Sequence, residues 1–415
     1  MYYKRSCTPQ TLGLELRKFT TFRVIVHQIC AKLFALIMSY EIINSVERRQ
    51  ECATSLRSNI STAANMSAFI GMDGFIDQII HIVDKRTTPT EYTRLATIEK
   101  FAERVAAAAG KSTNFEMVAQ LVKLGGNGPI MANAIANFGI KLSYLGSLDY
   151  PDIHSVFKDF ASKGDVQSIA NAGRTDALEF DDGKLIMGRM TQLNEVNWEN
   201  IVARYGKEKF IEKFTQSDFI GFVNWTMLPH MSDIWDVVLK EICPKMNPTG
   251  KRREIFFDLA DPEKRSKEDI KRALDLVCQF EKYFDVILGL NEKEGYEIAE
   301  VLSFDTSNRT PDGLANIAIK IQKQLNINTL VIHPVAYALA VSNGEVSIVK
   351  GPFCEKPLIS TGAGDHFNSG FCLGKILGFD NVKSLLAAVS TSGFYVRTAI
   401  SPSMNDLAVF LENWA

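Results

Sequence analysis

The sequence predicts an α/β protein in which helices cover both faces of a mostly parallel sheet. Short apolar segments with strand character alternate with helical segments from about residue 66 to the end of the chain. That rhythm is typical of parallel strands joined by right-handed helical crossovers. Chemically informative polar residues follow several of these strands, which is where ligands bind in such sheets.

Composition narrows the class of protein. The 415-residue chain has 46% hydrophobic residues and a formal net charge of -2, from 46 basic and 48 acidic side chains. This balance gives no support to a nucleic-acid or membrane partner, because either usually leaves a basic excess. The seven cysteines form no C-x-x-C pair, so we expect a reducing, cytoplasmic setting without a disulfide framework.

Residues 1–66 are expected to form an N-terminal extension outside the fold. Residues 1–40 are basic and acid-poor, and polar side chains such as Lys32 interrupt their apolar stretch. A transmembrane helix needs about 20 apolar residues, so this stretch is too short. A transit peptide would have this composition, but we favour an extension that precedes the true start, at Met38 or Met66.

The regular pattern begins with an apolar strand at 67–72. In the first half of the chain it continues with a partly alternating segment at 75–83, a helix at 95–109, a glycine-rich turn at 125–129, a helix at 130–138 and a strand at 141–146. In the second half we expect strands at 219–223, 255–259, 283–290 and 329–332, separated by helices such as 231–242 and 313–325.

One segment departs from this alternation. Residues 175–180 and 184–190 read as two strands, and the Asp181-Asp182-Gly183 sequence between them is typical of a hairpin turn. Because this hairpin interrupts an α/β chain, we expect a lid that stands off the main sheet. Its strands are predicted near 78–92 and 170–192.

The strongest chemical signal is the segment 360–371, in which Gly362, Ala363 and Gly364 precede Asp365 and a helical pattern follows. Small residues let a ligand approach the N–H groups of a helix N-terminus, which have no intrahelical partner, and the helix dipole favours an anion there. Asp365 could then accept a proton from an attacking hydroxyl. The segment could equally be an ordinary helix start with a capping side chain.

This segment resembles the second signature of the PfkB, or ribokinase-like, carbohydrate kinases, Asp-Thr-x-Gly-Ala-Gly-Asp. Three other blocks of that family occur in the same order. They are Gly71 with Asp77, the glycine turn at 125–128 with the strand leading to 146–149, and Asn291-x-x-Glu294. The resemblance spans 67–415.

The resemblance implies a ribokinase-like fold with a small β lid, and an ATP-dependent phosphotransferase. Its substrate would be the hydroxymethyl group of a sugar or sugar derivative. On this basis Asp365 is the general base, and the amides of Gly362, Ala363 and Gly364 form the anion hole. Thr361 is implied to contact the nucleotide.

The same resemblance assigns the remaining site residues. Asn291 and Glu294 would organise Mg²⁺ and phosphate, with Glu294 reaching the metal through water. Asp77, Gly126 and Asn127 would bind the substrate.

Two of these assignments have alternatives. Asn291 and Glu294 alone would suit a capping box. Asp73 competes with Asp77, because the spacing from Gly71 to Asp77 is one residue longer than the family's. We favour Asp77.

Several positions depart from the family pattern, among them Ala260, which stands where the family has an asparagine. Ile130 replaces an asparagine that touches substrate, so Asn127 or Asn133 is the candidate substitute. Ile359 replaces an acid that helps hold a monovalent cation in relatives, so a monovalent cation is doubtful as a cofactor. His333 stands near a position where Thr-x-Gly usually contacts nucleotide.

Some questions stay open at the level of sequence. We assign no role to His366, and Trp225 could line the pocket or belong to the core. A nucleoside kinase of adenosine type would use the same base, and a weakly catalytic sugar- or nucleotide-binding protein is a further alternative. A homodimer formed through the lid is also left open.

Overall fold

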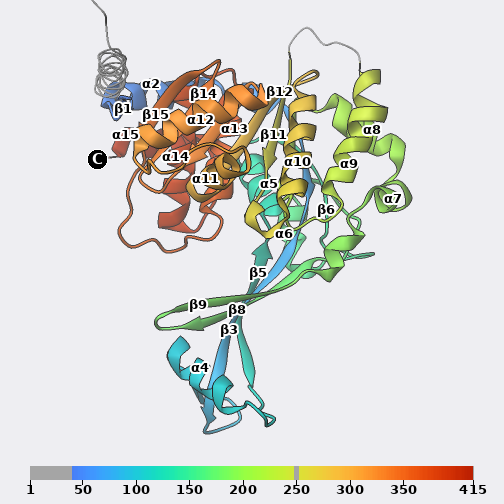
Figure 1. The fold of residues 1–415 in the computed structure, drawn as a ribbon, viewed down its shortest axis with the longest axis vertical. Coiled ribbons are helices and arrows are strands. Elements are labelled where there is room, and N and C mark those ends of the chain that lie inside the picture. Colours follow the sequence, from blue (N-terminus) through green and yellow to red (C-terminus); the bar gives the residue numbers. More distant parts are fainter. Residues whose placement is uncertain (1–39, 247–251, 415) are drawn as a thin grey trace, which may run out of the picture.

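A ten-stranded sheet forms the centre of the molecule in the computed structural model, which describes residues 40–246 and 252–414 (Figure 1). In spatial order its strands are β1 (Ile42–Ile43), β15 (Glu345–Lys350), β14 (Tyr337–Ser342), β13 (Thr329–His333), β12 (Asp285–Asn291), β11 (Glu254–Asp258), β10 (Phe219–Phe222), β2 (Ser67–Met72), β6 (Lys141–Gly146) and β7 (Gly164–Ser168). Strand β14 runs antiparallel to both of its neighbours. All other neighbouring pairs are parallel, so the mostly parallel sheet predicted from the sequence is confirmed.

Helices pack on both faces of this sheet. One face carries α8 (Lys207–Gln216), α9 (Met231–Val237), α10 (Lys267–Phe280), α11 (Glu292–Val301) and α12 (Pro311–Leu325). The other carries α2 (Val46–Ser58), α3 (Ile60–Ala63), α5 (Asn127–Asn137), α6 (Lys158–Ala161), α13 (Ala363–Ile376), α14 (Asn381–Thr398) and α15 (Met404–Asn413). The short helix α7 (Trp198–Asn200) precedes α8.

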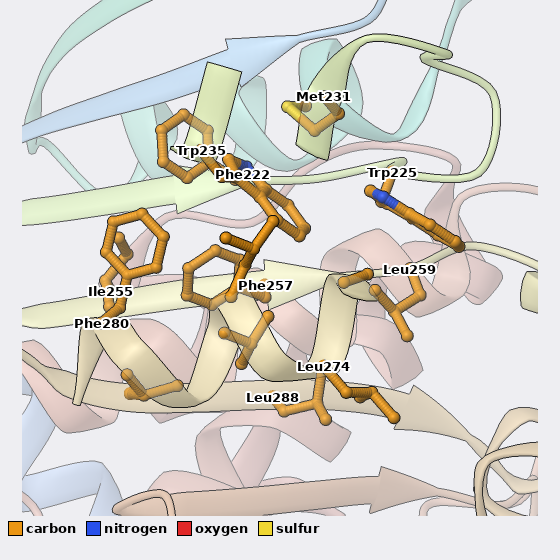
Figure 2. Packing of buried hydrophobic residues seen from close by; sticks show 14 of the residues in the cluster. Phe222, Trp225, Met231, Trp235, Ile255, Phe257, Leu259, Leu274, Phe280 and Leu288 are labelled. Atoms are coloured by element: carbon orange, nitrogen blue, oxygen red, sulfur yellow. The ribbon is translucent and has the colours of Figure 1, made fainter. Parts of the chain in front are cut away.

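Each face has its own hydrophobic core, because successive side chains of a strand point to opposite sides. Phe256 and Phe257 are neighbours on β11, yet Phe256 packs against α13 and α14 while Phe257 packs in the other core. Around Phe257 the rings of Trp235 and Phe280 lie at centroid distances of 4.9 and 5.2 Å (Figure 2). Two dense cores on one sheet hold the strand ends in fixed positions.

A second, smaller sheet extends away from the main body (Figure 1). It consists of β3 (Phe75–Arg86), β4 (Tyr92–Arg94), β5 (Met117–Gly125), β8 (Gly173–Phe180) and β9 (Gly183–Arg189). The strands expected near 78–92 and 170–192 lie in this sheet. Strand β5 was not anticipated. Helix α4 (Ile98–Ala107) covers one face, where Ile80, Ile82, Leu178 and Phe180 are buried.

The expected boundary at residue 66 differs from the structure. Strand β1 adds to the edge of the main sheet beside β15. Helix α2 packs against α14 and α15 and buries Cys52, Ala53 and Leu56 completely. This helix is polar overall and its buried stripe is made of small side chains, so hydropathy gave little sign of it. Residues 1–39 lie outside the described residues.

No helix within residues 40–246 and 252–414 combines the length and apolar character that crossing a bilayer requires.

Candidate active site

The candidate site lies at the carboxyl ends of the central parallel strands. Asp73 and Asn224 follow β2 and β10, whereas Asp258, Asn291 and His333 are the last residues of β11, β12 and β13. The first two turns of α13 meet this row, since Asn368 Nδ2 donates to Asp258 Oδ2 at 2.9 Å and the ring of Phe367 lies 4.7 Å from that of His333. The fold therefore gathers the polar strand ends around the helix start that the sequence singled out.

Helix α13 begins at a glycine turn without a capping side chain. Gly362 is its N-cap residue, with a left-handed φ of 90°, and no side chain caps the helix. A Cβ at Gly362 would lie 3.2 Å from Tyr395 Oη and 3.3 Å from Ile130 Cγ2. Glycine is therefore required both by the backbone conformation and by the close packing. Ile130, which replaces the family's asparagine, serves as a packing surface for this turn.

The amides of this turn are not equivalent. The N–H of Ala363 donates to the carbonyl of Ser360 at 3.1 Å. Among the described residues, the amides of Gly362 and Gly364 have no hydrogen-bond acceptor. Unpaired N–H groups at a helix N-terminus are suited to bind an anion.

Asp365 is a buried acid in the first turn of α13, with 7% of its surface exposed. Burial raises the pKa of Asp365 to about 8, and the nearby charge of Asp73 acts in the same direction, while a hydrogen bond from Asn127 opposes both. The side chain thus lies near the start of α5 as well as α13. A carboxyl group with a pKa close to neutrality is suited to proton transfer.

Asp73 is fully buried and its carboxylate holds three donors. It accepts from the backbone N–H groups of Asn127 at 3.0 Å and Gly128 at 2.7 Å, and from Asn224 Nδ2 at 2.6 Å. Burial raises the pKa of Asp73 to about 6, against these hydrogen bonds. The acid therefore anchors the N-terminus of α5 to the end of β2.

Asp77 lies on the lid strand β3, beside Lys123 of β5 and Thr175 of β8. Burial raises its pKa, and the charge of Lys123 partly opposes the shift. A Cβ at Gly125 would collide with the carboxylate of Asp77, so the glycine turn and the lid meet here. Asp77 is half-buried, unlike Asp73, and its carboxylate is not occupied by backbone amides.

Asn291 and Glu294 form a capping box at the start of α11. Asn291 Oδ1 accepts from the Glu294 amide at 2.9 Å, and Glu294 Oε2 accepts from the Asn291 amide at 2.8 Å. Glu294 Oε1 also accepts from the Asp261 amide at 2.8 Å. The motif is thus a capping box, which is the alternative that the sequence left open. Each of these side-chain oxygens still has a lone pair for a further partner.

Asp258 completes a cluster of buried acids. Its pKa is raised well above the usual range by burial and by the charges of Glu294 and Asp365. No group of three or more acidic, histidine or cysteine side chains in the described parts of the chain is arranged to hold a metal directly. A cation near this cluster would relieve the repulsion between these acids.

A pocket of about 300 Å³ opens beside the glycine turn. His333, Phe367, Ser360 and Gly364 line its inner end, and its outer part is largely apolar, with Pro334, Val335, Phe353 and Val396. Burial lowers the pKa of His333 to about 4, so its imidazole is neutral at physiological pH. The pocket can accept a partly apolar group next to the unpaired amides of the turn.

Four residues in or near the site escaped the sequence reasoning or were left open by it. Asn224 and Asn368 were missed, because only the fold brings them to Asp73 and Asp258. Asn133 faces away from the site, with Lys163 and Ser401 as partners, which leaves Asn127 as the asparagine near Asp365. Trp225 is fully buried in a hydrophobic core and donates to Ser232 (Figure 2).

Comparisons with known proteins show which family the chain resembles. A sequence model described as prokaryotic ketohexokinase matches residues 45–414. A ketohexokinase from Haloferax volcanii is 24% identical over 372 residues, which cover 89% of this chain and 96% of the relative.

Two solved structures show the same architecture. A ribokinase from Arabidopsis thaliana, complexed with ribose and ATP, has a TM-score of 0.59 at 14% identity, covering 84% of this chain and 98% of its own. A nucleoside kinase from Methanocaldococcus jannaschii has a TM-score of 0.52 at 14% identity, covering 83% and 98%. At such identities the likeness establishes the fold alone, and the ribokinase-like fold expected from the sequence is confirmed.

Proposed function

Because this chain belongs to the prokaryotic ketohexokinase family, it is a carbohydrate kinase, and we propose that it transfers the γ-phosphoryl group of ATP to a hydroxymethyl group of a ketohexose. The observation that carries the proposal is the buried Asp365 beside the unpaired amides of Gly362 and Gly364. A base next to an anion site is what phosphoryl transfer to a hydroxyl requires.

In the proposed reaction Asp365 accepts the proton of the attacking hydroxyl. The amides of Gly362, Ala363 and Gly364 stabilise the charge that develops on the transferred phosphoryl group. The amides of Gly362 and Gly364 are free to bind the phosphoryl group, whereas the amide of Ala363 must first break its hydrogen bond to the Ser360 carbonyl.

We propose that the sugar binds between the lid and the start of α5. Asp77 accepts hydrogen bonds from its hydroxyl groups, and Gly126 allows it close to the backbone, since a Cβ there would lie 3.1 Å from the Cα of Gly74. Asn127 lies next to Asp365 and contacts the hydroxyl that reacts.

The pocket beside His333 is proposed to hold the adenosine part of ATP, with Thr361 at its phosphate end. The apolar side chains of the pocket suit the base.

The residues around Glu294 fit a Mg²⁺ ion, because Asp258, Glu294 and Asp365 repel one another. Asn291 and Glu294 would hold the ion and phosphate through water. When bound, Mg²⁺ supplies positive charge to the phosphate oxygens.

A monovalent cation is not part of the proposal. Ile359 offers no carboxylate, and the carbonyls of Thr361 and Gly362 already accept hydrogen bonds from Tyr395 and His366. A cytoplasmic location also remains our proposal, supported by the free state of the described cysteines.

We propose that two copies of the chain associate through their lids. Ile79, Leu121, Ala177 and Ile186 are cross-strand neighbours and form an apolar row across four lid strands. Ile186 is 70% and Leu121 53% exposed. A two-fold axis would bury the same row on both copies.

An ADP-production assay with ATP, Mg²⁺ and panels of ketohexoses, aldoses and nucleosides tests the proposed activity. We expect turnover with a ketohexose, and its loss in Asp365→Asn with nucleotide binding retained. Turnover confined to nucleosides or aldoses would refute the substrate assignment. An Asp365→Asn variant with unchanged kcat would refute the role of Asp365.

A further inference from the structure

We propose that His366, together with Tyr395 and Ser401, positions the amides of the anion-hole turn. The inference rests on the proposed function, because it assigns a role to the residues behind that turn. It concerns a side chain to which the sequence gave no role.

His366 follows Asp365 in the chain, but its side chain lies behind the turn. Nδ1 is 2.7 Å from the carbonyl oxygen of Gly362, and Nε2 is 2.8 Å from Oγ of Ser401. Burial lowers the pKa of His366 to about 4, so the ring is neutral. A neutral ring satisfies both contacts when Nδ1–H donates to Gly362 and Nε2 accepts from the Ser401 hydroxyl.

Tyr395 holds the preceding carbonyl. Its hydroxyl donates to the carbonyl oxygen of Thr361 at 3.1 Å, and its ring stacks on the His366 ring with centroids 3.6 Å apart and planes 12° apart. The carbonyls of Thr361 and Gly362 are therefore each bound by a buried side chain.

These two bonds orient the amides on the other side of the turn. A peptide unit is planar and trans, so its carbonyl and its N–H point in opposite directions. Holding the Thr361 carbonyl fixes the direction of the Gly362 N–H, which has no acceptor among the described residues. Holding the Gly362 carbonyl restrains the peptide unit that carries the Ala363 N–H, which donates to the Ser360 carbonyl until it is released for the phosphoryl group. A glycine turn has little conformational preference of its own, so the direction of its amides depends on bonds from its surroundings. The Gly362 carbonyl accepts both the His366 backbone N–H, at 3.1 Å, and the His366 ring.

The bonds extend to the helix proposed to bind substrate. Asn133 Nδ2 donates to Ser401 Oγ at 3.1 Å, and Asn137 Nδ2 donates to the Ser401 carbonyl at 2.8 Å. Lys163 Nζ holds Asn133 Oδ1 at 2.8 Å. Because Asn133 and Asn137 lie on α5, the chain of bonds ties this helix to the turn that begins α13.

The test uses two replacements of His366, each of which can keep one of the two hydrogen bonds that the ring makes. Asparagine places an N–H near the position of Nδ1, so His366→Asn can still bind the Gly362 carbonyl. Glutamine places its amide near Nε2, so His366→Gln can reach Ser401 but not Gly362. We expect His366→Gln to lower kcat by roughly 10- to 100-fold, below the cost of deleting an anion-hole donor, and to leave both KM values nearly unchanged. His366→Asn should retain most of kcat.

Tyr395→Phe keeps the stacked ring and removes only the hydroxyl, so it remains informative if the His366 variants fold poorly. We expect it to lower kcat without changing the KM for ATP or sugar. Normal kcat in both His366→Gln and Tyr395→Phe would overturn the inference, and so would equal losses in His366→Asn and His366→Gln. Those results would leave the proposed function intact if Asp365→Asn were inactive, whereas a wild-type chain without turnover would refute the proposed function itself.

Discussion

At the scale of single residues, the main feature of the site is a group of buried acids that face one another. Asp365 is surrounded by Asp73 and Glu294, and Asp258 is affected by all three. Burial raises the pKa of each of these carboxyl groups, and repulsion by neighbouring acids adds to the shift for Asp258, Glu294 and Asp365, in agreement with the general behaviour of acids in low dielectric. A base tuned in this way can exchange protons near neutral pH, at a cost to the stability of the fold.

The pH dependence of catalysis follows from the raised pKa of Asp365. Only the deprotonated carboxylate can accept a proton, so kcat/KM for the sugar should rise tenfold per pH unit below about pH 8 and level off above it. A pH series at saturating ATP measures this profile. A plateau that already begins at pH 5 would show that Asp365 titrates normally or is not the base.

The raised pKa of Asp365 also predicts that Asp365→Asn stabilises the protein. The folded state binds the Asp365 proton more tightly than the unfolded state, whose pKa is near 3.8. Stability is therefore lost as the pH rises from about 4 to 8. Removing the charge should raise the free energy of unfolding at pH 7 by about 1–4 kcal/mol, with little effect at pH 4. Urea unfolding at the two pH values checks this, and a variant less stable at pH 7 would contradict it.

Replacing Asp77 should change the KM for the sugar, whereas replacing Asp73 should change stability and kcat. Asp77 is half-buried and proposed to contact substrate, so Asp77→Asn should raise the KM for the sugar and leave the KM for ATP unchanged. Asp73 holds three donors in the interior, so Asp73→Asn should lower both the melting temperature and kcat. Steady-state kinetics and thermal unfolding distinguish the two acids. The reverse pattern would make Asp73 the substrate ligand.

At the scale of elements, the N-terminal helix α2 belongs to the fold. Cys52, Ala53 and Leu56 are buried against the C-terminal helices, and Arg57 forms an ion pair with Glu412 of α15. Arg49 lies over the ring of Trp414 at 4.9 Å. Helix α2 therefore covers the outer side of α14 and α15, far in sequence from both.

Leu56→Ala tests whether α2 contributes to stability. The side chain is fully buried, and truncating a buried leucine usually costs about 2–5 kcal/mol. We expect a loss of that size in urea unfolding, with kcat of the folded enzyme unchanged. The control is Thr54→Ala, at an exposed position on the same helix, which should have little effect. Equal stabilities of the two variants would show that α2 is dispensable.

At the scale of the whole molecule, the described residues form a main body and a lid that projects from it (Figure 1). The main sheet has a core on each face, whereas the described part of the lid has a small separate core beneath α4. The opposite lid face begins at Asp77 near the site and continues into the apolar row, which is exposed at Leu121 and Ile186. One lid face thus combines the proposed substrate contact with the proposed dimer surface.

The proposed lid dimer should depend on the apolar row that includes Leu121 and Ile186. A charge at an exposed position, as in Ile186→Glu, should convert a dimer into a monomer, because pairing would bury the charge without a partner. The control Val202→Glu changes a residue that is 40% exposed outside the lid and should leave the dimer intact. Sedimentation at micromolar concentration measures both. A wild-type monomer would refute the lid dimer.

Several parts of this molecule were determined by local sequence alone. Strand β6, the hairpin of β8 and β9, and the helix after Asp365 were predicted because apolar period, turn residues and glycine spacing act over a few positions. The family of the chain followed from four such blocks in order. These features depend on neighbours in the chain, so the sequence displays them directly.

Only the tertiary structure decided which of these residues meet. Asp73 and Asn224 are 151 residues apart, and Asp258 and Asn368 are 110 apart, yet each pair is hydrogen-bonded. The packing of α2, the pairing of β5 in the lid and the bond from His366 to Ser401 are likewise contacts between distant segments. Such contacts form because two cores fix the strand ends in space, and a pattern read along the chain carries no record of that arrangement.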